Sequence, residues 1–192
     1  MGMSATARPT ATRRFTADEV WQMLRIGLLG EDEPYELLDG ELQYVSPADP
    51  AHAKVVNRVA MAFFAHYGPL GHVVRVQQPL SGIHDAIPEP DVAVVPRDVE
   101  EGEAHPRPGQ AVLLVEVAHT SLRRDQRKAS IYAAAGAPEY WIVDVDRRVV
   151  AIHRGPRSDG TWDSVVEAGL DAEVSMPGTA ATLPVAAVLT QP

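Results

Sequence analysis

Two carboxylates lie in segments whose apolar composition otherwise predicts buried β-strands. Asp91 opens the apolar run 91–95, and Glu116 interrupts the apolar run 111–117. Burying a carboxylate without a partner costs several kcal/mol, so such acids rarely stand unpaired in a covered strand. If the two strands are neighbours, the side chains converge, and two like charges about 4 Å apart repel by roughly 4 kcal/mol at an effective dielectric of 20. A shared proton or a divalent cation would relieve this repulsion.

Each acid also has a simpler explanation, in which it ends a strand and faces solvent or caps a neighbouring group. That explanation weakens for the pair, because Lys128 follows Glu116 within the next predicted helix. The stripe that carries Lys128 has members three or four residues apart, namely Asp125, Ile131, Tyr132 and Ala135. Its apolar members should turn this stripe toward the sheet. An ion pair with Asp125 and a lysine directed into an acidic metal pocket would each account for Lys128.

The segments before Asp91 predict two helices and a hairpin. Thr16 and Glu19 have the capping-box spacing that begins a helix, which Gly27 or Gly30 would end. The dipeptide Asp39-Gly40 favours a type I′ turn between strands 35–38 and 41–45, because both central residues of that turn need a positive φ. An N-cap at Asp49 followed by Pro50 predicts a second helix through residues 52–67.

The remaining elements alternate between strands and helices. We expect strands at 73–78, 91–95 and 111–117, a long helix at 122–135, a hairpin from 140–145 and 149–154, short strands or turns, and a short helix at 184–189. The segment 98–110 is acidic, contains two prolines and is expected to be a loop. The continuous apolar runs indicate strands that are covered on both faces. This order predicts an α/β fold with a mixed sheet flanked by helices.

Composition limits the class of protein. The chain has 192 residues, of which 45% are hydrophobic and 22% charged, which suits one domain with a real core. We expect a flexible tail at 1–14 and a single domain at 15–192. The net charge of -9 excludes a generally basic, nucleic-acid-coating surface but not a local basic patch. The absence of cysteine excludes disulfides and thiolate chemistry, and no apolar run reaches the ~20 residues of a membrane helix. The N-terminus does not resemble a signal peptide, so a cytoplasmic location is expected.

The chain resembles the Uma-two family, which is grouped with restriction endonucleases of the PD-(D/E)XK nuclease superfamily. The resemblance runs from about Phe15 to Arg154. Its motifs occur here in the family's order, as Tyr35-Glu36-Leu37-Leu38-Asp39-Gly40-Glu41, Ser46-Pro47, His52, Pro90-Asp91-Val92, Val115-Glu116-Val117, Asp125 to Lys128, and Gly136-Ala137-Pro138-Glu139-Tyr140-Trp141-Ile142-Val143-Asp144.

The resemblance implies a restriction-endonuclease-like core and a set of site residues. Asp91 and Glu116 would be ligands of a Mg²⁺ or Mn²⁺ ion, and Glu36 would be a further acid near the metal or its water. The common nuclease motif has a lysine two residues after the glutamate, where this chain has Ala118. The family's pattern instead takes the lysine from the following helix, which matches Lys128. The implied activity is metal-dependent hydrolysis of phosphodiester bonds, in DNA more than in RNA.

Several polar side chains near these motifs are candidates for substrate contacts. Arg123, Arg124 and Arg127 form a basic cluster with Lys128, which would contact phosphate or simply cover a solvated helix face. His52 follows the family's pattern and would support the site or serve the core or a helix cap. His119 lies close enough in sequence to the predicted pocket to reach a substrate or metal.

Other functions explain part of the pattern. A nuclease fold retained as a binding or assembly module would suit the net charge of -9, which disfavours polyanions over most of the surface. Paired carboxylates also occur in glycosidases, which need neither a metal nor an inward lysine. The chain has no G-x-S-x-G elbow and no phosphate-binding glycine loop. The resemblance implies nucleic acid, DNA more than RNA, as the partner, and we expect a homodimer because enzymes that cut both strands often have two copies.

Overall fold

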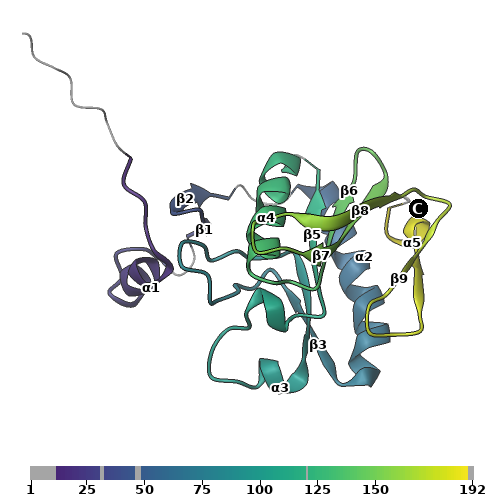
Figure 1. Ribbon diagram of the computed structural model, residues 1–192, viewed down its shortest axis with the longest axis horizontal. Coiled ribbons are helices and arrows are strands. Elements are labelled where there is room, and N and C mark those ends of the chain that lie inside the picture. Colours follow the sequence, from purple (N-terminus) through teal and green to yellow (C-terminus); the bar gives the residue numbers. More distant parts are fainter. Residues whose placement is uncertain (1–11, 31–32, 46–48, 120, 190–192) are drawn as a thin grey trace, which may run out of the picture.

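A six-stranded mixed sheet forms the centre of the computed structural model, which describes residues 12–30, 33–45, 49–119 and 121–189 (Figure 1). The strands lie in sequence order, as β3 (His72–Val76), β4 (Val92–Pro96), β5 (Leu113–Ala118), β6 (Glu139–Asp144), β7 (Val149–Pro156) and β8 (Trp162–Ala168). Only β5 and β6 pair in parallel, and α4 (Leu122–Ala134) connects them. All other neighbours are antiparallel. The predicted mixed sheet is confirmed.

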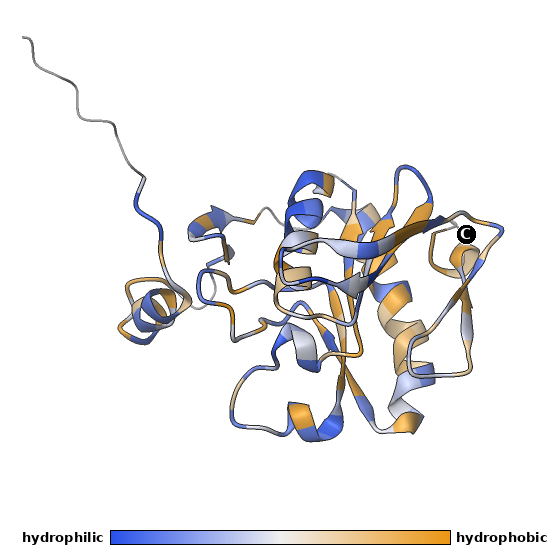
Figure 2. Ribbon diagram, in the orientation of Figure 1, coloured by the Kyte–Doolittle hydropathy of each residue, from blue (hydrophilic) through white to orange (hydrophobic). Residues whose placement is uncertain are grey.

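Helices cover both faces of the sheet, as its apolar strands require. One face packs against α2 (Pro50–Tyr67) and the short α5 (Val185–Leu189), and its core includes Val92, Val94 and Val115. The intervening residues of the same strands, such as Ala93 and Leu114, face α4 in a second core. Hydrophobic residues accordingly run along the central strands between the helices (Figure 2). Every residue of β5 is buried, which explains why its sequence is a continuous apolar run.

The N-terminal elements form a separate layer at one end of the molecule (Figure 1). Helix α1 (Ala17–Arg25) has the predicted capping box, and Gly27 follows its C-cap with a φ of 71°. The hairpin of β1 (Tyr35–Leu38) and β2 (Glu41–Tyr44) turns at Asp39 and Gly40, whose φ angles of 47° and 76° are both positive. These elements pack together through a small apolar cluster of Ala17, Val20, Leu37 and Ile87. The hairpin thus has its own apolar support outside the main sheet.

The C-terminal part contains more regular structure than its sequence indicates. Strand β8 is a seven-residue edge strand whose central residues are all exposed, so it lacks the alternating pattern that reveals a strand. A small second hairpin follows, made of β9 (Glu173–Ser175) and β10 (Thr182–Pro184). The expected loop 98–110 includes the short helix α3 (Arg97–Glu100) and the 3₁₀ turn η2 (Pro108–Gln110), and another turn, η1 (Gly68–Leu70), follows α2.

Some sequence expectations lie outside this description. Residues 1–11 of the expected tail and the motif residues Ser46 and Pro47 are not among the described residues. Among the described residues, none of the helices combines the length and the apolar character that a membrane span requires.

The hairpin turn makes the first testable prediction. A Cβ added at Gly40 would lie 2.7 Å from Cβ of Arg14, and the positive φ disfavours any side chain there. We expect Gly40→Ala to lower the free energy of unfolding by more than about 1 kcal/mol, measured by urea denaturation. Gly71→Ala has a similar φ but open space around its Cβ, so it isolates the backbone effect. Gly169→Ala has open space and no positive φ and serves as control. A loss at Gly40 no larger than at Gly169 would contradict the assigned turn.

Candidate active site

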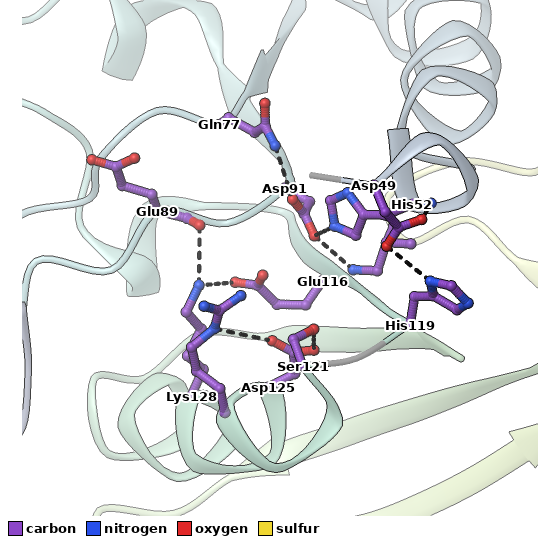
Figure 3. A network of polar contacts seen from close by, with 12 residues as sticks. Asp49, His52, Gln77, Glu89, Asp91, Glu116, His119, Ser121, Asp125 and Lys128 are labelled. Atoms are coloured by element: carbon purple, nitrogen blue, oxygen red, sulfur yellow. Dashed lines mark hydrogen bonds and ion pairs between the residues drawn. The ribbon is translucent and has the colours of Figure 1, made fainter. Parts of the chain in front are cut away.

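The register of the central strands brings the two anomalous carboxylates together. Strands β4 and β5 pair antiparallel with Val92 opposite Val115, and continuing this register by one residue brings Asp91, just before β4, next to Glu116. Opposed residues of antiparallel strands lie on the same face, with Cβ atoms typically about 4.5–5.5 Å apart. Both side chains are buried, at 7% and 3% exposure. In Figure 3 the Glu116 carboxylate extends toward Lys128 of α4, whereas the Asp91 carboxylate lies beside His52 of α2.

Lys128 of α4 extends into this acidic region. Its Nζ lies 2.6 Å from Oε1 of Glu36. Nζ also lies 2.9 Å from Oε1 of Glu116 and donates to the carbonyl oxygen of Glu89 at 3.1 Å (Figure 3). Three acceptors match the three N–H donors of an ammonium group. Lys128 is only 2% exposed. The structure therefore directs the lysine to the acids of the sheet and the hairpin, and the alternative ion pair with Asp125 does not form.

Further hydrogen bonds fix the acids around Lys128. Tyr132, one turn after the lysine on α4, donates its hydroxyl to the same Oε1 of Glu116 at 3.0 Å. Glu36 comes from β1 of the N-terminal hairpin, and its Oε1 also accepts the backbone N–H of Glu89 at 2.8 Å. Burial alone would lower the pKa of Lys128, but the charges of Glu116 and Glu36 raise that pKa above its ordinary value. The ammonium therefore stays charged.

Asp91 has its own set of donors on the other side of the pair. Its Oδ2 accepts the backbone N–H of Val117 at 2.8 Å and lies 3.0 Å from Nε2 of His52, while Oδ1 lies 3.3 Å from Nε2 of Gln77. His52 belongs to the first turn of α2, which Asp49 caps through its side chain. Burial would raise the pKa of Asp91, but these hydrogen bonds and the nearby positive charges lower it below its usual value. The hydrogen bond with Asp91 in turn raises the pKa of His52.

The site carries more negative than positive charge. Four buried carboxylates belong to it, namely Glu36, Asp91, Glu116 and Asp125, and Lys128 is the buried cation among them. Burial raises the pKa of Glu116 well above its usual value despite the opposing charge of Lys128, and the charges of Asp91 and Asp125 raise it further. Burial also raises the pKa of Asp125 to about 6, against the lowering effect of the Ser121 hydrogen bond. An additional cation near Glu116 would offset this repulsion.

The carboxylate oxygens of Asp91 and Glu116 could hold a hard divalent cation, although they make up only two protein ligands. Within the described residues, no three His, Asp or Glu side chains are grouped as ligands of one metal ion. The two opposed carboxylates still offer oxygens: Oε2 of Glu116 accepts no hydrogen bond from the described residues, and Oδ1 of Asp91 has only the long contact with Gln77. Mg²⁺ keeps several waters and is commonly bound through one or two carboxylates. The chemistry of the pair is therefore compatible with such an ion.

The arginines of the predicted basic cluster on α4 make different contacts. Arg127 forms ion pairs with Asp39 and with Glu41, at 3.3 Å to the latter, so it holds the hairpin turn. Nε of Arg124 lies 4.0 Å from Oδ1 of Asp125, and Arg123 is exposed with no partner among the described residues. Arg123 is thus the exposed arginine of the cluster, while the side chains of Arg124 and Arg127 are half-buried, at 31% and 33% exposure.

His119 lies beside the site rather than in it. Its Nδ1 lies 2.8 Å from Oδ2 of Asp49, the N-cap of α2, and its Nε2 lies 3.3 Å from Oδ1 of Asp146. The Asp49 hydrogen bond raises the pKa of His119. This histidine therefore joins the end of β5 to the start of α2.

Three residues of the site were not assigned a site role from the sequence. Gln77 continues the β3–β4 register, in which Val76 faces Val92, and so comes opposite Asp91. Glu89 contributes main-chain groups, which no residue-type pattern reveals. Tyr132 was visible as a member of the Lys128 stripe, since four residues separate the two, but its hydroxyl had no assigned acceptor. For Gln77, knowledge of the β3–β4 register would have been needed to predict that it lies opposite Asp91.

Comparisons with known proteins agree with this architecture. A model of the Uma2 family, described as "Putative restriction endonuclease", matches residues 18–186. None of the curated proteins compared with the chain is significantly similar to it. The fold is similar to the crystal structure of a protein from Anabaena variabilis ATCC 29413 described as a putative nuclease belonging to DUF820, with a TM-score of 0.73 and 17% sequence identity. The match covers 91% of this chain and 97% of that one. Since the family model spans most of its length, the chain belongs to the Uma2 family.

Proposed function

We propose that the protein is a metal-dependent endonuclease that hydrolyses phosphodiester bonds of nucleic acid, DNA in preference to RNA. The observation that carries this proposal is the placement of one buried ammonium between Glu36 and Glu116, with Asp91 opposite Glu116. Membership of a family described as restriction endonucleases supports the reaction class. If the enzyme cuts both strands of a duplex, a homodimer would supply the second site.

Asp91 and Glu116 would hold the metal ion, for which Mg²⁺ and Mn²⁺ are the candidates. When bound, such an ion polarises a phosphoryl oxygen and lowers the pKa of a bound water. The carboxylates fit this role because Asp91, held at the N–H of Val117, lies next to Glu116, and both retain oxygens that are free of strong hydrogen bonds. His52 positions Asp91 through the 3.0 Å contact with Oδ2. Oδ1 of Asp91 has only the 3.3 Å contact with Gln77 and would be available to the metal ion. The metal site would thus be preorganised by strands β4 and β5.

Lys128 would stabilise the negative charge that develops on the phosphate during hydrolysis. A preformed cation in a water-poor site does this effectively, since no reorganisation is needed at the moment of reaction. Glu36 and the carbonyl of Glu89 hold the ammonium in place. Ala118 occupies the position where the common nuclease motif has its lysine, but Nζ of Lys128 reaches Glu116 directly from α4. Arg123 and Arg124, near the start of the same helix, are the candidates for phosphate contacts.

A binding module without catalysis is the second candidate function. Lys128 already compensates two of the acids, and the described residues include no three-ligand metal cluster. The net charge of -9 also weakens general attraction to polyanions. In this alternative the ion network would be a structural device that anchors the hairpin. The two candidates differ in whether a divalent ion binds between Asp91 and Glu116.

Cleavage assays with site variants test the enzyme directly. We expect Glu116→Gln and Lys128→Gln each to reduce cleavage at least about 100-fold, because each removes a charge that the transition state requires. The assay uses single- and double-stranded DNA and RNA with Mg²⁺, Mn²⁺ or EDTA. Gln126→Ala alters an exposed residue of the same helix and should retain full activity. Cleavage that survives in both site variants would contradict the roles assigned here.

Thermal stability with and without metal tests the binding of the ion. At a concentration about 100 times its Kd, a bound ion adds about 2.7 kcal/mol, which should raise the Tm of the wild type by roughly 5–10 °C. Asp91→Asn should remove this increase, whereas Asp98→Asn, an exposed acid of α3, should preserve it. A wild type whose Tm is unchanged by Mg²⁺ and Mn²⁺ would favour the binding module.

A further inference from the structure

A largely apolar cavity of about 410 Å³ lies between α1 and the β1–β2 hairpin, next to the candidate site. Its volume falls within the ~300–1,000 Å³ typical of small-molecule sites. Side chains of Trp21 and Tyr35 contribute aromatic surface to its lining, and Arg25 and Glu89 contribute charged groups. Neither the network around Lys128 nor the sheet core uses this cavity.

Glu89 connects the cavity to the site. Its carbonyl accepts from Lys128 and its N–H donates to Glu36, while its side chain lines the cavity. In Figure 3 this side chain extends away from Lys128. A substrate strand whose phosphate lies at Lys128 would therefore have a neighbouring base within reach of the cavity.

The lining chemistry selects a flat, partly polar ligand. The ring of Trp21 is stacked on His105, with ring centroids 5.6 Å apart and an interplanar angle of 20°, which fixes its orientation. Within the described part of the chain, the carboxylate of Glu89 and the guanidinium of Arg25 have no hydrogen-bond or ion-pair partner. Bases stack on aromatic side chains, and exocyclic amino groups donate to carboxylates. An aliphatic ligand would leave the carboxylate of Glu89 and the guanidinium of Arg25 without a hydrogen-bond partner.

We propose that this cavity receives one unstacked nucleobase of the substrate strand, with Trp21 as its stacking surface and Glu89 as the acceptor for an exocyclic amino group. The proposal rests on the proposed nuclease function, because the phosphate at Lys128 defines which strand is bound. It implies a preference for single-stranded or locally open nucleic acid. It also implies a preference for bases with an exocyclic amino group, namely cytosine, adenine and guanine, over thymine at the base that enters.

Equilibrium binding to labelled oligonucleotides tests the base site without cleavage. Fluorescence anisotropy with EDTA would compare a dC 12-mer, a dT 12-mer and a 12-mer of abasic units, all with the full chain. We expect Trp21→Ala to weaken binding of the dC strand by about 5- to 150-fold and to leave binding of the abasic strand unchanged. Trp21→Phe should restore most of the affinity if stacking is the cause. Phe64→Ala removes an exposed aromatic side chain of α2 and should change none of these affinities.

Base selection by Glu89 is tested with the same strands. We expect Glu89→Gln to reduce the ratio of dC to dT affinity several-fold, because a charge-assisted hydrogen bond becomes a neutral one. Any general gain from removing a negative charge would affect both strands equally and leave this ratio unchanged. An unaltered ratio would overturn the role of Glu89.

The outcomes separate the base site from the proposed catalysis. Base-dependent binding through Trp21 together with an absence of cleavage would end the nuclease proposal and leave the base site standing. Metal-dependent cleavage by a wild type that binds normal and abasic strands equally would end the base site alone. An equal loss of both strands in Trp21→Ala would also overturn it, as would a wild type that binds no oligonucleotide.

Discussion

The buried ammonium of Lys128 is the interaction on which the arrangement of the site depends. It joins three parts of the chain that are distant in sequence, through Glu36 of the hairpin, Glu116 of β5 and the carbonyl of Glu89 before β4. Breaking a buried pair by removing one partner typically costs about 3–5 kcal/mol, because the other charge is left uncompensated. The hairpin, which its apolar cluster joins to α1, is therefore tied to the sheet by charge. A site built this way keeps its geometry only while the whole network is intact.

Asp91 and Glu116 are unusual core residues because they place negative charge in an otherwise apolar interior. The face of the sheet that packs against α4 is apolar at Ala93 and Leu114 but acidic at Asp91 and Glu116. Burial raises the pKa of Glu116 and of Asp125, and the acids repel one another, so the arrangement is less stable than a fully apolar one would be. The excess negative charge that costs stability is also what would attract a divalent cation. Proteins commonly accept such local destabilisation at functional sites.

Sequence reasoning succeeded where local patterns have local causes. The acids stood out because a covered strand should be apolar, and Lys128 stood out because its stripe also carries Ile131 and Tyr132. The stripe left the partner of Lys128 undecided, since Asp125 lies one turn away on the same helix, while the actual partners come from the hairpin and β5. Contacts that depend on strand register or on main-chain groups have no such signal. The edge strand β8 was expected only as a short strand or turn, because its central residues are all exposed and show no alternating pattern.

The distribution of cations constrains how a chain of net charge -9 can hold nucleic acid. Electrostatic affinity grows with the number of phosphates that lysines and arginines neutralise. On α4, Lys128 is buried between Glu36 and Glu116 and Arg127 pairs with the hairpin turn, which leaves Arg123 exposed and Arg124 half-buried beside Asp125. Few phosphate contacts are therefore available next to the site. In the proposed function, binding would come largely from base stacking on Trp21 and from a metal ion between the carboxylates. Both act at short range, so such a protein would select locally open sites rather than coat nucleic acid.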